Sequence, residues 1–167
     1  IDAALVEINP ECELQLLGSH YQPFAPDLQK TLFNLSQADE IQLEQLINFD
    51  QLLGKLYGET CLSLLNKYEY SASDIQAIGC HGQTIRHKPR PNAFSMQIGD
   101  ANIIAELTGI TTIADFRRRD IAAGGEGAPL VPAFHQAVFV GFPNPVSSTQ
   151  LPLPTIGSVK IPECVVA

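Results

Sequence analysis

The sequence feature that most limits the possible folds is a long amphipathic segment from about Asp39 to Lys67. Its apolar residues recur every three or four positions, which places them on one side of an α-helix. The stripe comprises Leu43, Leu46, Ile47, Phe49, Leu52, Leu53, Leu56, Leu64 and Leu65, together with Thr60. Because helix faces of this kind are usually buried, we interpret the stripe as core packing and not as a cofactor groove. We expect Asp39 to cap this helix.

Strand-like segments lie on both sides of this helix. Residues 1–8 and 13–21 read as two strands joined at Asn9-Pro10, and a short helix is predicted from about Asp27 to Leu35. Further along the chain we expect, in order, one helical turn at Ser71–Asp74, strands at Ile75–Cys80 and Phe94–Ile98, a helix at Ala101–Leu107 closed by Gly109, a strand at Thr111–Ala114 and a helix at Val131–Val140. Strands followed by helices that alternate with strands indicate an α/β or α+β domain with a mixed sheet.

A basic cluster interrupts this acidic chain. The sequence has ten Lys and Arg against eighteen Asp and Glu, and three of the ten are consecutive. The block contains Arg117, Arg118 and Arg119, followed by Gly124, Gly125 and Gly127. Guanidinium groups bind carboxylate or phosphate with paired hydrogen bonds, and glycines let backbone N–H groups approach a ligand. We therefore expect a loop that leaves the end of a buried strand and binds an anion.

Two acids flank the arginines. Asp115 and Asp120 are candidates for acid/base or metal chemistry. We favour the alternative, in which each carboxylate neutralises and orients a neighbouring arginine. The glycines that follow are not a nucleotide-binding P-loop, since no Gly-Lys-Ser/Thr sequence comes after them.

A second polar cluster, His81-Gly82-Gln83-Thr84, follows the predicted strand that ends at Cys80. Gln83 and Thr84 can hydrogen-bond sugar hydroxyls or amides, and Gly82 permits close backbone approach. A polar turn with a satisfied histidine explains the same residues equally well, so both interpretations stay open. A thiol nucleophile at Cys80 is disfavoured, because adjacent strand residues face opposite sides of a sheet.

Composition excludes several classes of protein. A net charge of −8 and a pI near 4.8 argue against a nucleic-acid partner, and no apolar run reaches the length of a membrane span. The four cysteines are scattered without a Cys-x-x-Cys pair, which favours free thiols in a reducing cytoplasm and no zinc site. Met96 is the only methionine, so we expect a piece of a longer protein. Residues 141–167 hold five of the twelve prolines and are predicted to be an irregular tail.

Three motifs together resemble the anhydro-N-acetylmuramic acid kinases. They are Ala77–His87, Gln97–Asp100 and Thr108–His135, and the likeness covers residues 1 to about 139. The resemblance implies a sugar kinase of the actin-like, ribonuclease-H-like superfamily, with residues 1–140 forming an N-terminal domain that lacks its first strand. Such kinases hydrolyse the anhydro bridge of anhydro-N-acetylmuramic acid and transfer a phosphoryl group from ATP, with Mg²⁺, to its 6-oxygen. They act in bacterial cell-wall recycling in the cytoplasm and are usually homodimers.

The resemblance also implies site residues. The sugar-facing residues would be His81, Gly82, Gln83, Thr84, Arg117, Arg118, Arg119, Asp120, Gly124, Gly125 and Gly127, with one arginine holding the lactyl carboxylate of the sugar. Asp2 would border the ATP-phosphate loop of the family. The motif that carries the catalytic base of the family does not occur in this sequence, so we expect no catalytic residue, no metal ligand and an inactive fragment. The alternative is a stand-alone, non-catalytic module that binds a sugar or a partner.

Overall fold

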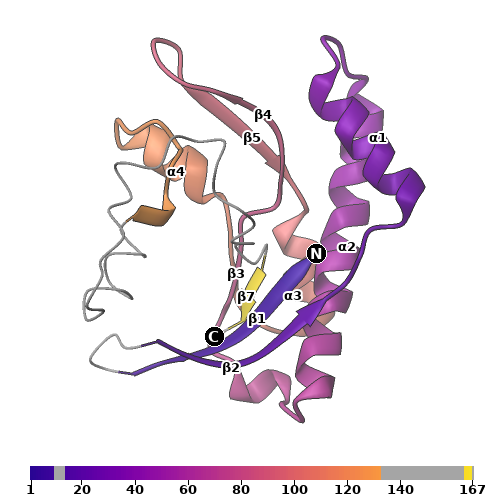
Figure 1. Ribbon diagram of the computed structural model, residues 1–167, viewed down its shortest axis with the longest axis vertical. Helices are drawn as coiled ribbons and strands as arrows, with labels where there is room; N and C mark the ends of the chain where they lie inside the picture. The colour runs from indigo at the N-terminus through magenta and orange to yellow at the C-terminus, as the bar shows by residue number, and fades with distance from the viewer. Residues whose placement is uncertain (10–13, 133–163, 167) are drawn as a thin grey trace, which may run out of the picture.

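The structure is a computed structural model that describes residues 1–9, 14–132 and 164–166, and it contains a five-stranded mixed sheet (Figure 1). The strands are β1 (Asp2–Ile8), β2 (Leu14–Tyr21), β3 (Ile78–Cys80), β6 (Thr112–Ile113) and β7 (Cys164–Val166), in the order β2-β1-β7-β3-β6. β1 pairs antiparallel with β2 and parallel with β7, whereas β3 pairs antiparallel with β7 and parallel with β6. The predicted mixed sheet is therefore confirmed.

The centre of the sheet is built from apolar strand residues. In β1 the four consecutive residues Ala3–Val6 are all buried, which is typical of a strand covered on both faces. Its neighbour β2 is exposed at four of its eight residues, as expected for a strand at the edge of the sheet. Among the described residues the core continues through Leu53, Tyr57 and Ile104, which are fully buried.

Four helices of more than one turn accompany the strands in the described part of the chain: α1 (Pro26–Gln37), α2 (Leu43–Lys67), α3 (Ala101–Thr108) and α4 (Phe116–Ala122). The long helix is confirmed, but its cap is not Asp39. Residues 38–42 lie outside both flanking helices, and Gln42 is the N-cap of α2, so Asp39 lies too far from the first turn to accept its N–H groups. In the predicted stripe, Leu53, Thr60, Leu64 and Leu65 are buried. Leu43, Ile47 and Leu52 are exposed, and for them the core prediction is wrong.

A second, two-stranded sheet is formed by a hairpin of β4 (Gln83–Lys88) and β5 (Phe94–Ile98). In Figure 1 this hairpin projects beyond the main sheet, with α4 on one side and α1 on the other. β5 was predicted, whereas β4 was not, because only Ile85 in β4 is a buried apolar residue. The capping box at Ser71–Asp74, which forms η1 (Ala72–Asp74), and the left-handed Gly109 that ends α3 are both confirmed.

Several other expectations change. The predicted strands Ile75–Cys80 and Thr111–Ala114 shorten to β3 and β6, and the predicted arginine loop is the helix α4. The prediction of an irregular tail is wrong for Cys164–Val166, which form β7. Their backbone pairs with β1 and β3, and this pairing does not require a periodic pattern of apolar residues in the sequence. The expected helix at 131–140 and the turn at Asn9-Pro10 extend into positions outside the described residues. The division at residue 140 stays a prediction.

Asp50 of α2 fixes the end of the hairpin against the helical layer. Its carboxylate Oδ1 accepts a hydrogen bond from the Gly99 N–H at 2.7 Å, and its carbonyl accepts one from the Asp100 N–H at 3.1 Å. A side chain at Gly99 would collide with the Tyr57 ring, since a Cβ there would lie 2.4 Å from Cε2. β5 therefore ends at a defined position beside α2 and α3. No helix in the described part of the chain is both long and apolar enough to cross a membrane.

Candidate functional site

The first part of the site is the junction between β3 and β4, where the chain turns at Gly82. Gly82 is buried with a φ of 69°, and a Cβ at this position would lie 2.6 Å from the carbonyl oxygen of Ile98. Only glycine combines the left-handed conformation with so close an approach to another backbone. This tight turn brings His81 and Gln83 close to the end of β5.

The arginine block forms the second part, and α4 divides its three side chains. Arg117 is half-buried, and its Nη1 donates a hydrogen bond to the carbonyl oxygen of Gly127 at 2.9 Å. Arg118 is exposed and holds Asp115 with two contacts, Nε to Oδ1 at 2.7 Å and Nη2 to Oδ2 at 2.5 Å. Arg119 is also exposed and borders the same shallow depression as Asp115 and Arg118. The predicted loop would have kept the three arginine side chains together, whereas the helix separates them.

The two acids beside the arginines have different roles. The carboxylate of Asp115 raises the pKa of Arg118 through hydrogen bonding and then through its charge, so the predicted neutralising partner is confirmed there. For Asp120 that interpretation is wrong. Its Oδ2 accepts a hydrogen bond from the Gly127 N–H at 2.8 Å, and its carbonyl accepts one from the Gly125 N–H at 2.9 Å. The last turn of a helix leaves carbonyl groups that need donors, and the Gly125 N–H supplies one to the Asp120 carbonyl, while the Asp120 carboxylate accepts the Gly127 N–H.

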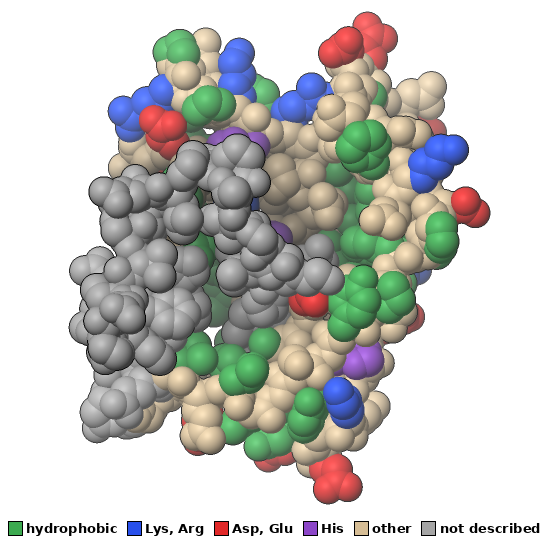
Figure 2. Space-filling model, viewed as in Figure 1, with side chains coloured by type: hydrophobic (Ala, Val, Ile, Leu, Met, Phe, Trp, Pro, Cys, Tyr) green, Lys and Arg blue, Asp and Glu red, His purple; other side chains and the backbone are tan. Residues whose placement is uncertain are grey.

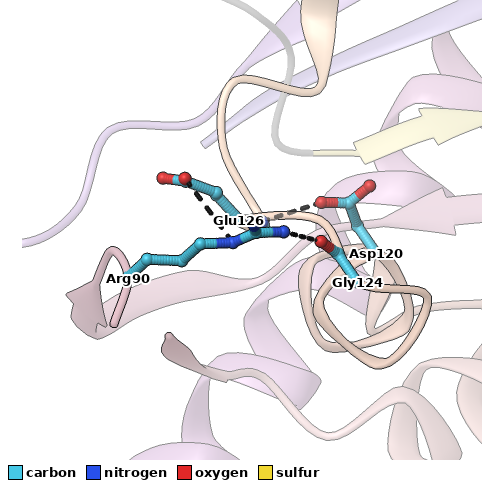
Figure 3. A network of polar contacts seen from close by, with 5 residues as sticks. Arg90, Asp120, Gly124 and Glu126 are labelled. Carbon is cyan, nitrogen blue, oxygen red and sulfur yellow. Dashed lines mark hydrogen bonds and ion pairs between the residues drawn. The ribbon is translucent and has the colours of Figure 1, made fainter. Parts of the chain in front are cut away.

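The hairpin touches the same glycine segment from the opposite side (Figure 3). Arg90, at the tip between β4 and β5, donates a hydrogen bond from Nη2 to the carbonyl oxygen of Gly124. Its Nε lies 3.8 Å from Oε1 of Glu126. The segment Gly124–Gly127 is thus held by α4 from one side and by the hairpin from the other. Sequence reasoning did not select Arg90, and its place in a Pro-Arg-Pro turn gave no signal of this contact.

His81 and Arg117 form the electrostatic centre of the site. Burial lowers the pKa of His81, and the nearby positive charge of Arg117 lowers it further, so the imidazole is neutral near pH 7. Among the described residues, His81 Nδ1 and Arg117 Nε are both buried without a hydrogen-bond partner. Hydrogen bonds of the His81 ring with the backbone of Gly82 and of His81 itself act in the opposite direction and raise its pKa. Buried polar atoms are normally paired, so the two nitrogens, one of them part of the Arg117 cation, are candidates for contact with a ligand oxygen.

Gln83 and Thr84 were expected at the end of a strand, but they lie at the beginning of β4. Thr84 pairs in register with Gln97, and the Gln97 amide Nε2 donates to the Thr84 hydroxyl at 3.3 Å and to Ser95 Oγ at 2.6 Å. Thr84 is thereby committed to contacts within the hairpin. Gln83 instead borders a cavity that also contains Asp2, on the side of α1.

The surroundings of Asp2 do not fit the predicted cofactor. That cavity is lined by one acid and, among the described residues, by no lysine, arginine or histidine. A triphosphate needs cations or converging N–H groups, and Mg²⁺ needs further oxygen ligands beside one carboxylate. In the described ranges no group of three or more His, Cys, Asp or Glu side chains could hold a metal ion. The assignment of Asp2 to the cofactor stays a prediction.

Of the predicted site residues, the structure brings together His81, Arg117, Asp120, Gly125 and Gly127, with Gly124 held next to them by Arg90. Arg118 and Arg119 lie on the exposed side of α4, and Gln83 lies toward α1. The fold and the site define a class of protein: a mixed α/β domain in which a half-buried arginine, Arg117, lies near His81 and holds the glycine segment after α4.

Comparison with known proteins specifies that class. The family model described as anhydro-N-acetylmuramic acid kinase matches residues 1–156. An anhydro-N-acetylmuramic acid kinase of Coxiella burnetii (strain Dugway 5J108-111) is 50% identical over 137 residues, which are 81% of this chain and 36% of that protein. One from Actinobacillus pleuropneumoniae serotype 5b (strain L20) is 52% identical over 126 residues, 75% of this chain and 34% of that protein. The chain belongs to the anhydro-N-acetylmuramic acid kinase family, and it spans about a third of the length of these curated relatives.

Proposed function

We propose that this chain supplies sugar-binding residues of an anhydro-N-acetylmuramic acid kinase, with Arg117 holding the lactyl carboxylate of the sugar beside His81. The observation that supports the proposal is that Arg117 Nε and His81 Nδ1, two of the three buried side-chain nitrogens without a hydrogen-bond partner among the described residues, belong to neighbouring groups; the third is His87 Nδ1. A carboxylate offers two oxygens and a negative charge, which match a guanidinium fork and a neighbouring imidazole.

The other two arginines are weaker candidates. Arg118 already makes a two-point contact with Asp115, so a ligand carboxylate would have to displace an existing partner. Arg119 lies in an exposed position, where water screens its charge. Arg117 combines partial burial with a fixed orientation, since its Nη1 donates to the Gly127 carbonyl while its Nε has no hydrogen-bond partner among the described residues.

The activity of the complete protein is part of the same proposal and rests on the family likeness. We propose a phosphotransferase that uses ATP and Mg²⁺, opens the anhydro bridge and phosphorylates the 6-oxygen of the sugar. An actin-like arrangement of domains, a homodimeric state and a bacterial cytoplasmic location belong to this proposal on the same ground. The residues described here contribute binding and orientation of the sugar, which lower the cost of bringing reactants together.

Titration of the ¹⁵N-labelled 167-residue chain with anhydro-N-acetylmuramic acid, followed by NMR, tests the proposal. Amide signals of His81–Gln83, Arg117 and Gly127 are expected to shift together and to give one dissociation constant. Shifts confined to Arg118 and Arg119, or no shifts at millimolar sugar, would contradict the assignment of the pocket.

A further inference from the structure

The main sheet ends at β2 on one side, and an edge of this kind can accept a further strand. Among the described residues β2 pairs with β1 alone, so the backbone groups on its other side face no strand. Its eight residues, LQLLGSHY, include no Asp, Glu, Lys or Arg, although charged side chains are a usual protection of an exposed edge. Hydrophobic side chains lie at the surface in the lower part of Figure 2, where Figure 1 places β2 and the end of α2. Other features must therefore keep this edge from pairing.

A β-bulge protects the first part of the edge. Leu5 pairs with Gly18 and Val6 pairs with Leu16, so Leu17 is one residue more than β1 can match. A bulge increases the local twist of a strand and turns its edge away from further pairing. The regular stretch that remains for another strand runs from Gly18 to Tyr21.

Within that stretch, the backbone groups of Ser19 point away from β1. Ile1 and Gln22 exchange two backbone hydrogen bonds, from the Gln22 nitrogen at 2.8 Å and from the Ile1 nitrogen at 2.6 Å. Along an antiparallel pair, residues that exchange such bonds alternate with residues whose N–H and C=O groups point outward. Ser19 lies three positions before Gln22, so its N–H and C=O groups both point to the open side of the sheet.

The end of α2 occupies both of these groups. The Ser19 N–H donates a hydrogen bond to the Tyr68 hydroxyl at 3.1 Å, and the Ser19 carbonyl accepts one from that hydroxyl at 3.2 Å and one from Lys67 Nζ at 3.1 Å. Tyr68 lies directly against the strand, since a Cβ at Gly18 would be 2.5 Å from its ring atom Cε2. Lys67 Nζ lies 5.0 Å from the centre of the same ring, which adds a cation–π contact. We call Lys67 and Tyr68 the edge clamp.

We propose that the edge of β2 is a self-association surface, and that the edge clamp holds it closed against a second copy of this chain. Two β2 strands related by a twofold axis pair antiparallel, because the same residues then meet from both sides. Neither strand brings a charge that would repel the other. This pairing uses the Ser19 groups that the clamp occupies, so the clamp and the paired state exclude each other. The clamp contains none of the residues assigned to the sugar, and the inference is independent of the proposed function.

Sedimentation of the wild-type chain and of the double variant Tyr68→Phe/Lys67→Met tests the proposal. Salt at about 0.15 M screens the repulsion between two acidic chains. The two substitutions keep the aromatic ring and the apolar stem, and they remove the three hydrogen bonds to Ser19. Tyr70→Phe, the same change at an exposed tyrosine two residues later, is the matched control. Adding Ser19→Lys to the double variant places like charges in the two pairing strands.

The double variant is expected to dimerise at least about 10-fold more tightly than the wild-type chain, because three hydrogen bonds in each copy no longer compete with pairing. Tyr68→Phe alone should shift association in the same direction by less, and Tyr70→Phe should behave as the wild type. Ser19→Lys should return the double variant to wild-type association. Equal association of the wild type, Tyr68→Phe and the double variant would overturn the proposal. A dimer that persists with Ser19→Lys would also overturn it, since the surface would then lie elsewhere.

Discussion

The carboxylate Oδ2 of Asp120 lies 2.8 Å from the backbone nitrogen of Gly127, seven residues further along the chain. The carbonyl oxygen of the same glycine accepts the guanidinium of Arg117, one helical turn before Asp120. Arg117 and Asp120 thus lie on one face of α4 and hold the two polar groups of a single residue. Gly125 passes so close to this carboxylate that a Cβ would lie 2.1 Å from Oδ2. Helix and glycine segment therefore form one unit.

Removal of the Asp120 carboxylate should loosen that unit. Asp120→Ala leaves the Gly127 N–H without its acceptor, and because the bond is charged and half-buried we expect a loss of about 1–2 kcal/mol in the free energy of unfolding. Asp120→Asn keeps an oxygen acceptor and should lose less. Urea denaturation of the three chains measures both values. Equal stabilities for wild type and Asp120→Ala would show that the contact contributes nothing.

The turn at Gly82 allows a matched comparison of backbone strain and steric conflict. Gly82 and Gly109 have nearly the same φ, 69° and 70°, but a Cβ at Gly109 would have no atom within 4 Å whereas one at Gly82 would meet Ile98. Gly109→Ala should cost about 1–2 kcal/mol from the left-handed conformation alone. Gly82→Ala should cost a further 1–3 kcal/mol or so for the collision. Similar thermal unfolding midpoints for the two variants would contradict the close approach of β3–β4 to β5.

Local signals in the sequence predict much of this fold. The apolar run of β1, the stripe of α2, the box at Ser71–Asp74 and the glycine after α3 each specify their element without help from distant residues. The same is true of β5. The predictions from sequence fail where contacts between residues far apart in the chain determine the secondary structure. The polar strand β4 is stabilised by its pairing with β5. In the same way, β7 is stabilised by its pairing with β1 and β3.

In the candidate site, too, some features could be predicted from the local sequence and others depend on the three-dimensional structure. Residue types pointed to an anion pocket at Arg117–Arg119, but three consecutive arginines look alike in the sequence. Only the helical rotation of α4 separates Arg117, which faces Gly127, from Arg118, which faces Asp115. Arg90 had no local signal, because its partner Gly124 lies 34 residues further along the chain.

Binding of the acidic sugar should be coupled to protonation of His81. Burial and the charge of Arg117 hold the pKa of His81 below its ordinary 6.5 in the free chain, and a carboxylate bound beside it would raise that pKa. Between the two pKa values the complex binds more protons than the free chain, so affinity should rise as the pH falls toward the lowered pKa of His81 in the free chain, while the carboxylate stays ionised.

Calorimetry at pH 6 in two buffers of different ionisation enthalpy measures this proton uptake. Uptake is expected for anhydro-N-acetylmuramic acid, and none for 1,6-anhydro-N-acetylglucosamine, which lacks the lactyl acid. His81→Gln should abolish it. Identical uptake with both sugars would show that His81 does not sense the lactyl carboxylate.

The Arg90 contact should affect local motion more than global stability. Both partners of its ion pair with Glu126 are largely exposed, so Arg90→Ala should change the free energy of unfolding by about 1 kcal/mol or less. Hydrogen exchange at Gly124 and Gly125 should nevertheless become faster, because the hairpin no longer holds this segment. Lys88→Ala, an exposed change on the same hairpin, is the control. Unchanged exchange in Arg90→Ala would mean that α4 alone fixes the glycines.

The most direct test of the account compares three single variants, Arg117→Ala, Arg118→Ala and Arg119→Ala, with the acidic sugar and its neutral analogue. A charged hydrogen bond is worth about 1.5–3 kcal/mol, so Arg117→Ala should weaken binding of anhydro-N-acetylmuramic acid by roughly 10- to 150-fold. The same variant should bind 1,6-anhydro-N-acetylglucosamine as the wild-type chain does, and the other two variants should bind both sugars normally. Unchanged affinity of Arg117→Ala for the acidic sugar, or an equal loss for both sugars, would contradict the central claim that Arg117 binds the sugar carboxylate.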